Sequence, residues 1–202
     1  TPGGLLGAEI VADASGYFRV ERIFPGASQD EGQRSPLAEP GVQVRAGDFI
    51  LAVDGVDART VRNFYQLLQG KGGQKVSLRV NARASSEGSR EVRVGTLTSE
   101  QELRYTQWVG ERRAMVDRLS GGRIGYIHLP NTAVDGNREL FKGMLAYADK
   151  EALIIDDRYN GGGFIPDRMI ELLARKPLNY WKRRGLDPQA TPMLSHNGPK
   201  AM

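Results

Sequence analysis

The chain passes from an apolar strand through a polar turn into a helical pattern at Ala152-Leu153-Ile154-Ile155-Asp156-Asp157-Arg158-Tyr159-Asn160-Gly161-Gly162-Gly163-Phe164-Ile165. An unbroken apolar run of this kind is typical of a strand that is buried on both faces, as in a parallel sheet. The helical pattern continues from Pro166 to Leu173. We therefore predict a strand, a turn and a helix, with the turn as a candidate site.

The turn contains three consecutive glycines, Gly161, Gly162 and Gly163. Because glycine has no side chain, the backbone N–H groups of such a run can converge on one point. Converging amides suit the stabilisation of a developing oxyanion, or the binding of an anion at a helix N-terminus. A loop without a ligand is the alternative interpretation of the triplet alone.

Size and composition limit the class of protein. The 202 residues have room for one large domain or for two of about a hundred residues each, and we interpret them as two. No apolar run approaches the roughly 20 residues of a membrane helix, so we expect a soluble, cytoplasmic protein without a membrane partner. The absence of cysteine excludes disulfides and thiolate metal sites, and two histidines are too few for a histidine-rich cluster. We expect neither a metal nor another cofactor.

The ends of the chain show no boundary signals. Thr1-Pro2-Gly3-Gly4 contains no initiating methionine and no signal sequence, and Lys200-Ala201-Met202 follows no terminating element. We expect the sequence to be part of a longer protein.

The positive charge does not form a pattern that binds nucleic acid. The net charge is +4, but basic residues are interleaved with acidic ones. The densest basic run, Lys182-Arg183-Arg184, is predicted to be a solvated turn. Because aromatic residues are not interleaved with the basic ones, we predict no nucleic-acid partner.

The first half of the chain consists mainly of strand patterns. Alternating or apolar runs predict strands at Glu9 to Val11, Tyr17 to Ile23, Phe49 to Val53, Val76 to Val80 and Val92 to Val94. Asp54-Gly55 predicts a tight turn after the third of these. A polar loop is predicted over Pro25 to Pro40, with one helical turn at Pro36-Leu37-Ala38. Thr60 is expected to cap an amphipathic helix from Val61 to Gln69.

The most specific part of this half is Ala46-Gly47-Asp48-Phe49-Ile50-Leu51-Ala52-Val53-Asp54-Gly55. It resembles the G-D-x-I-x-x-V-[ND]-G signature of PDZ domains, in the circularly permuted form found in bacterial and archaeal proteases. The resemblance covers roughly residues 3 to 96. It implies a partly open β-barrel with a helix.

The PDZ resemblance also implies a binding loop for a ligand carboxylate. The family carries a G-L-G-hydrophobic tetrapeptide before the first groove strand, and Leu5-Leu6-Gly7-Ala8 occupies that place here. The amides of Leu6, Gly7 and Ala8 would hold the carboxylate of a peptide C-terminus that adds as a strand to Glu9 to Val11. Leucine replaces the leading glycine and alanine replaces the final bulky residue, so an altered or inactive pocket is the alternative.

Two leucines of the predicted helix, Leu67 and Leu68, are candidates to face the terminal side chain of the peptide. The alternative is that both fill a small core.

The second half of the chain alternates between helix and strand. Thr98 or Ser99 is expected to cap a helix that ends before Gly121-Gly122. The pattern predicts a strand at Arg123 to Pro130, then a helix that is capped by Asn131 to Val134 and runs to about Ala148, and then the strand before the glycine triplet. This order implies parallel strand pairing.

Three segments of this half resemble the tricorn protease family, which is related to the C-terminal-processing serine proteases: Gly122 to Pro130, Leu153 to Gly163 and His196 to Lys200. The resemblance covers essentially the whole chain. It implies a PDZ domain at 1–97, a connecting helix at 98–121 and, at 122–202, the truncated N-terminal part of a crotonase- or ClpP-like catalytic domain with the order βαβα. The expected fold class is a mixture of α/β and mostly-β structure.

The resemblance implies a serine endopeptidase that hydrolyses short peptides and forms a homo-oligomer. In that family the nucleophilic serine follows the counterpart of Lys200 and the basic histidine precedes the PDZ domain, so both lie outside this chain. We therefore expect no catalytic residue within the chain, and an inactive fragment. Ser195 and His196 do not form a dyad, because adjacent side chains of an extended segment point to opposite faces. His128 is expected to be a structural histidine.

Gly161, Gly162 and Gly163 match the family's glycine stretch, whose amides bind the substrate backbone and the tetrahedral oxyanion. Asp156 and Arg158 are expected to fix the turn through buried hydrogen bonds. The alternative function is a peptide-binding PDZ module on a catalytically silent crotonase-like scaffold. The sequence beyond Met202 would distinguish the two, because an apolar strand that ends in a Gly-Ser turn indicates an enzyme.

Overall fold

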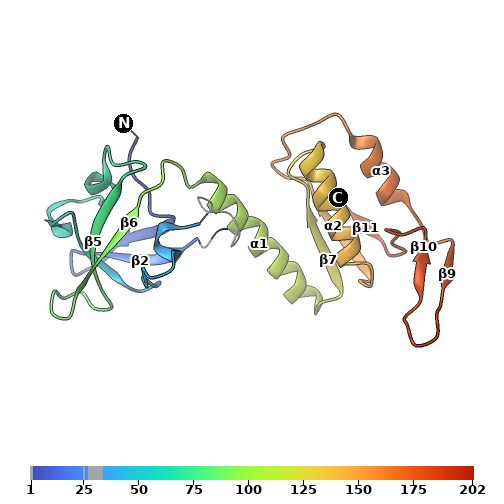
Figure 1. Ribbon diagram of the computed structural model, residues 1–202, viewed down its shortest axis with the longest axis horizontal. Helices are drawn as coiled ribbons and strands as arrows, with labels where there is room; N and C mark the ends of the chain where they lie inside the picture. Colours follow the sequence, from blue (N-terminus) through green and yellow to red (C-terminus); the bar gives the residue numbers. More distant parts are fainter. Residues whose placement is uncertain (1, 25, 27–33) are drawn as a thin grey trace. The chain divides into compact units, whose positions relative to one another are not determined.

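A computed structural model of the chain describes residues 2–24, 26 and 34–202 (Figure 1). Its contacts divide the chain into two compact units, Thr1–Trp108 and Val109–Met202. Most of the first part of the predicted polar loop, Pro25 and residues 27–33, lies outside the described residues. The helical turn predicted in the same loop is confirmed as the 3-10 helix η1, Pro36–Ala38.

The first unit is built on one antiparallel sheet in the order β1-β2-β3-β5-β6, with β4 paired to β3. The strands are β1 Ala8–Ala12, β2 Phe18–Ile23, β3 Phe49–Val53, β4 Val56–Asp57, β5 Lys75–Asn81 and β6 Arg90–Gly95. A bridge between Leu5 and Leu97 joins the chain before β1 to the chain after β6. The two ends of the strand order are thereby linked, which confirms the predicted partly open barrel.

The turn of the PDZ-like signature closes the β3–β4 hairpin. Asp54 and Gly55 both have positive φ, 48° and 80°, as a two-residue hairpin turn requires. The Asp54 carboxylate accepts hydrogen bonds from the Ser77 amide at 2.8 Å and the Lys71 ammonium at 2.6 Å. The signature therefore ties the hairpin to β5.

The predicted amphipathic helix from Val61 to Gln69 is wrong. The segment contains only the 3-10 helix η3, Phe64–Leu68, and a separate 3-10 turn, η2, precedes it at Ala58–Thr60. Val61 is extended, and the Asn63 side chain, not Thr60, caps η3 by accepting from the Tyr65 amide at 3.0 Å. Asn63 at one end and Gly70 with φ of 72° at the other leave too few residues for a run of α-helical hydrogen bonds.

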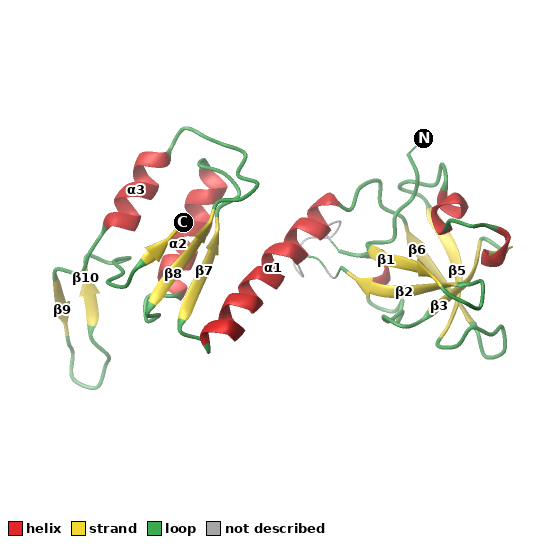
Figure 2. Cartoon of the chain, turned by 180° about the vertical axis from the view of Figure 1, so that it is seen from behind, coloured by secondary structure: helices red, strands yellow, loops and turns green. Residues whose placement is uncertain are grey.

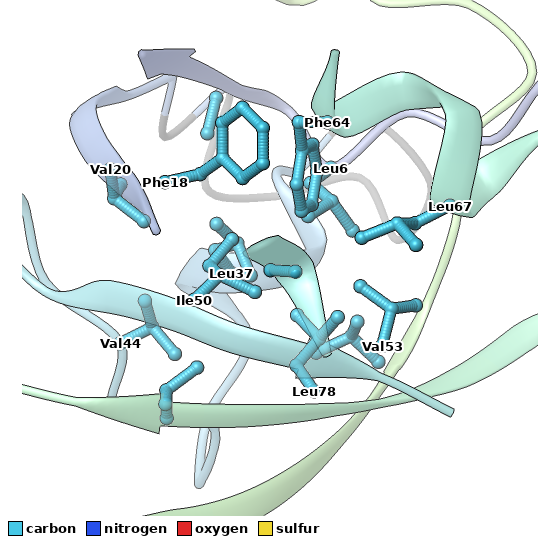
Figure 3. Packing of buried hydrophobic residues seen from close by; sticks show 14 of the residues in the cluster. Leu6, Phe18, Val20, Leu37, Val44, Ile50, Val53, Phe64, Leu67 and Leu78 are labelled. Atoms are coloured by element: carbon cyan, nitrogen blue, oxygen red, sulfur yellow. The ribbon is translucent and has the colours of Figure 1, made fainter. Parts of the chain in front are cut away.

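The core of the first unit is a single apolar cluster (Figure 3). It joins side chains of β1, β2, β3, β5 and β6 to those of the 3-10 turns. Leu6 and Leu68 are fully buried, and Leu67 is 8% exposed. The leucines of η3 therefore pack in the core, as the alternative interpretation of this segment expected.

The second unit contains a three-stranded parallel sheet in the order β11-β8-β7 (Figure 2). It begins within α1, Gln101–Ser120, and continues with β7 Ile124–His128, α2 Val134–Ala146, β8 Ala152–Asp156, α3 Pro166–Ala174, β9 Asn179–Trp181, β10 Gln189–Thr191 and β11 Lys200–Ala201. The predicted order of strand, helix, strand and helix from β7 to α3, and the parallel pairing of β7 with β8, are confirmed. The sequence patterns indicated neither the β9–β10 hairpin nor β11.

A second apolar cluster holds α2 and α3 against this sheet. Leu140 and Met144 of α2 meet Ile127 of β7, and Met169 and Leu172 of α3 complete the cluster. The approach of α2 to β7 is close at Gly143, where an added Cβ would lie 2.5 Å from the Cγ1 atom of Ile127.

We expect Gly143→Ala to lower the free energy of unfolding by about 1–3 kcal/mol, because the methyl group overpacks the contact between α2 and β7. Gly110→Ala is the matched control, since Gly110 lies in α1 and an added Cβ there meets no atom within 4 Å. This control should raise the stability of the chain by about 0.5–1 kcal/mol through helix propensity. Urea denaturation followed by circular dichroism measures both, and equal effects of the two substitutions would contradict the close packing.

Candidate functional site

The glycine turn begins after β8 and is bonded to the segment that follows β7. The Gly161 amide donates to the Pro130 carbonyl at 2.9 Å, and the Thr132 amide donates to the Gly162 carbonyl at 2.9 Å. The Ile165 amide then donates to the Thr132 carbonyl at 3.0 Å. These three backbone bonds fix the position of the turn, while the three glycines remain exposed to solvent.

Two positions of the triplet require glycine. Gly162 has φ of 81° and Gly163 has φ of 150°, both in the region that L-residues rarely adopt. At Gly163 an added Cβ would also lie 2.4 Å from the Thr132 carbonyl carbon. At Gly161 the nearest atom would be the Pro130 oxygen at 3.8 Å, which is an ordinary contact.

The three amides of the triplet differ in what they bind. Gly161 donates to Pro130, and Gly162 donates to the Asn160 side-chain oxygen at 2.7 Å. Within the described part of the chain, the Gly163 amide donates to no acceptor. Of the three predicted donors, Gly163 is therefore the one whose amide forms no bond within the described residues.

A buried carboxylate fixes the start of this turn. Asp156 is 7% exposed and accepts from the Tyr126 hydroxyl at 2.6 Å, from the Arg158 amide at 3.1 Å and from the Arg158 Nε at 2.9 Å. The guanidinium group is bidentate, because its Nη2 also lies 2.5 Å from Asp156 Oδ2. The predicted role of Asp156 and Arg158 in holding the turn matches these bonds.

The electrostatics of this cluster favour the charged carboxylate. Hydrogen bonds from Arg158 and then from Tyr126 hold the pKa of Asp156 well below its ordinary value of 3.8. Burial, with the hydrogen bond to Asp156, raises the pKa of the Tyr126 phenol. Burial lowers the pKa of the neighbouring His128. At neutral pH the cluster therefore contains a carboxylate and a neutral phenol.

Ser195 and His196 do not form a catalytic pair. The Ser195 hydroxyl donates to the Pro192 carbonyl at 2.7 Å. The His196 ring bonds the Lys150 carbonyl through Nε2 at 2.9 Å and accepts from the Gly198 amide at Nδ1. Both side chains therefore fix the chain that leads into β11.

In the first unit, the carbonyls of the predicted carboxylate loop, Leu5 to Ala8, accept hydrogen bonds from the rest of the unit. The Ser35 hydroxyl donates to the Leu6 carbonyl at 2.9 Å, and the Phe24 amide donates to the Gly7 carbonyl at 2.9 Å. Gly7 has φ of 65°, and an added Cβ would lie 2.7 Å from Ser35. Two carbonyls of the loop are thus engaged, and glycine is required at position 7.

The amides of this loop already have an acceptor. Glu100 Oε1 accepts from the Gly7 amide at 2.7 Å and from the Ala8 amide at 3.3 Å. Glu100 Oε2 accepts from Arg104 Nε at 3.1 Å and Nη2 at 2.9 Å. A side-chain carboxylate therefore lies on two of the three amides that the sequence assigned to a ligand carboxylate.

The other predicted peptide-binding residues are buried. Leu6 and Ala8 are fully buried, and Leu67 lies in the same core cluster (Figure 3). The half-buried Tyr65 of η3 also interacts with the Glu100 charge. Burial raises the pKa of its phenol, and the negative charge of Glu100 raises it further. The assignment of Leu67 to a ligand contact remains a prediction.

Sequence reasoning missed Glu100 as part of this site. Its position before α1 indicated only an acidic residue in the first turn of a helix. The hydrogen bond to Gly7 spans 93 residues, and no local pattern encodes a contact of that length.

Other kinds of site receive no support from the structure. Among residues 2–24, 26 and 34–202, no group of three or more histidine, cysteine, aspartate or glutamate residues could hold a metal ion. None of the described helices is long and apolar enough to span a bilayer.

Known proteins with related sequences or structures support one family. A protein-family model described as the tricorn protease PDZ domain matches residues 4–99. Tricorn protease homolog 1 of Streptomyces coelicolor is 39% identical over 196 residues, which are 97% of this chain and 18% of that protein. The tricorn protease homolog of Saccharolobus solfataricus is 36% identical over 201 residues, which are 98% of this chain and 18% of that protein.

Among solved structures, the crystal structure of the tricorn protease matches with a TM-score of 0.83 and 28% sequence identity. The match covers 98% of this chain and 19% of that one. The chain therefore spans under a fifth of the length of each of these relatives.

We expect Tyr126→Phe to lower the free energy of unfolding by about 1.5–3 kcal/mol at pH 7, because it removes a hydrogen bond to a buried charged acceptor. Since the folded-state pKa of Asp156 is lowered, the stabilisation is present above the ordinary aspartate pKa and is lost as the pH falls through the folded value. Because Asp156 stays ionised in the folded state well below its ordinary pKa of 3.8, the difference between the variant and the parent should be about the same at pH 3 as at pH 7.

Chemical denaturation at pH 7 and pH 3 measures this difference. Tyr180→Phe is the control, since Tyr180 is an exposed residue of β9. A variant as stable as the parent at pH 7, or a difference that disappears between pH 7 and pH 3, would contradict a bond to an Asp156 that is held in its charged form.

Proposed function

Because the chain belongs to the tricorn protease family, we propose that it is part of a serine endopeptidase that hydrolyses short peptides. The chain supplies a PDZ domain and a backbone donor for the substrate. The observation that carries this proposal is the amide of Gly163, an exposed residue in a fixed turn, which donates to no acceptor in the described part of the chain.

The nucleophilic serine and the basic histidine are contributed by parts of the enzyme outside these 202 residues. Attack of serine on a peptide carbonyl creates a negative oxygen, which the active site must stabilise by hydrogen bonds. A donor that is held in place before the reaction stabilises this charge without reorganisation, and loss of one such donor costs roughly 3–4 kcal/mol of transition-state stabilisation.

Within the glycine triplet we assign the donor role to Gly163. Gly161 and Gly162 act through their bonds to Pro130, Asn160 and Thr132, which hold the turn at the end of β8. The buried Asp156 is the last residue of β8, and its hydrogen bonds with Arg158 and Tyr126 hold the start of the same turn.

The PDZ domain is proposed to bind peptide segments by strand addition to β1. In the sheet order β1 is the terminal strand, with β2 as its neighbour. A peptide backbone that pairs with such an edge gains main-chain hydrogen bonds independent of its side chains. We further propose that the full-length enzyme is a cytoplasmic homo-oligomer.

We expect Gly163→Ala in the full-length enzyme to lower kcat and kcat/KM together, by about 10²–10³-fold, because the methyl group collides with Thr132 and moves the donor. Gly161→Ala is the matched control, since its Cβ meets only an ordinary contact, and its activity should stay within a few-fold of the parent. Steady-state hydrolysis of a fluorogenic peptide measures both variants.

Circular dichroism and gel filtration establish that each variant is folded. A folded Gly163→Ala enzyme with unchanged kcat would contradict the donor role. Only a parent enzyme without peptidase activity would favour the alternative in which this unit is a silent scaffold for the PDZ domain.

A further inference from the structure

We propose that Glu100 is the resident ligand of the carboxylate loop and sets the specificity of the PDZ domain against free peptide C-termini. A peptide that brings its own terminal carboxylate to this loop must first displace the Glu100 side chain. This inference rests on the proposed peptide binding by the PDZ domain.

The first argument is the geometry of the Glu100 carboxylate. Its side chain is 4% exposed, and one of its oxygens bonds the Gly7 and Ala8 amides at 2.7 and 3.3 Å. A carboxylate oxygen that accepts hydrogen bonds from two adjacent backbone amides is the arrangement by which such a loop recognises a peptide terminus. Glu100 therefore occupies the position of the ligand group and does not merely lie beside it.

The second argument is that the fold fixes the direction of these two amides. The Leu6 and Gly7 carbonyls are bonded to Ser35 and to the Phe24 amide, and Ser35 is fully buried. Gly7 has a positive φ and no room for a Cβ. The direction of the Gly7 and Ala8 amides is thus fixed by the fold, and an anion that binds them must enter where Glu100 now lies.

The third argument is charge. A carboxylate removed from water is stable only if it is paired and hydrogen-bonded. Arg104, one helical turn further along the chain, supplies both conditions with two hydrogen bonds to Oε2. The guanidinium group in turn lies 4.5 Å from the centre of the Phe24 ring, which holds it over the loop. The Glu100 carboxylate is therefore fully satisfied, as expected for a resident ligand.

The specificity follows from which amides of the first unit Glu100 bonds and which it leaves to a peptide. It bonds the amides of Gly7 and Ala8, at the start of β1, and its backbone forms no strand beside β1. An internal peptide segment can pair with the rest of β1 while Glu100 stays in place. A free C-terminus competes with Glu100, so its apparent affinity is reduced by the fraction of molecules in which Glu100 is released.

The test uses two fluorescent probes and the whole 202-residue chain. One probe is an acetylated heptapeptide that ends in leucine with a free carboxylate, and the other is the same peptide with a C-terminal amide. We expect Glu100→Ala to bind the free-carboxylate probe at least about tenfold more tightly than the parent does, because the competitor is gone. Affinity for the amidated probe should not change.

Glu102→Ala is the matched control. Glu102 is an exposed acid in the first turn of α1, so its removal changes the net charge equally without opening the loop. Its affinity for both probes should equal that of the parent. Glu100→Gln provides a second variant that keeps the size and the acceptor oxygen, so that it folds even where alanine does not. It should show a smaller gain for the free-carboxylate probe, because a neutral amide binds Arg104 and the loop more weakly.

Fluorescence anisotropy separates the outcomes. If the parent already prefers the free-carboxylate probe and neither Glu100 variant improves on it, Glu100 is not the resident ligand, although the PDZ domain still binds peptides. An equal gain for both probes also overturns the assignment. If no folded variant binds either probe, the proposed peptide binding fails and this inference fails with it.

Discussion

Backbone hydrogen bonds hold the glycine turn against the segment that follows β7. Hydrogen bonds from Gly161 to Pro130, from Thr132 to Gly162 and from Ile165 to Thr132 join the chain after β8 to the chain after β7. Because parallel strands end at the same edge of a sheet, these two segments meet there, and the contact at Gly163 leaves no space for a side chain. The unbonded Gly163 amide in the described chain, and with it the proposed chemistry of the second unit, is a consequence of this constraint.

Both units contain a glycine turn and a buried carboxylate, but the carboxylate is placed differently relative to the amides of the turn. Each contains backbone amides in a turn that only glycine can adopt, and each has a buried carboxylate paired with an arginine close by in the sequence. In the first unit the carboxylate, Glu100, lies on the amides and fills the loop. In the second unit the carboxylate, Asp156, holds the strand end through Arg158 and Tyr126, and the Gly163 amide stays open. The position of the carboxylate relative to the amides decides whether the turn is filled or available.

Much of the fold could be predicted because local patterns agree with the tertiary structure. The strands β3 and β8 are apolar runs that end in turn residues, and the family signatures cover both. The helix at Val61 to Gln69 could not be excluded from its apolar pattern, since only the structure shows the Asn63 cap and the short 3-10 form. Glu100 and the pairing of β11 with β8 depend on contacts between distant residues, which no local periodicity records. The glycine triplet was predicted as a unit, but the division of roles within it required the hydrogen bonds.

The most direct measurement is a crystal structure of the full-length enzyme after reaction with a peptide aldehyde, which forms a tetrahedral adduct with the nucleophilic serine. The account predicts that the Gly163 nitrogen lies about 2.7–3.1 Å from the oxygen of the adduct, with the bonds from Gly161 to Pro130 and from Thr132 to Gly162 unchanged. An adduct oxygen that is bound by other donors, with the Gly163 amide facing solvent, would contradict it.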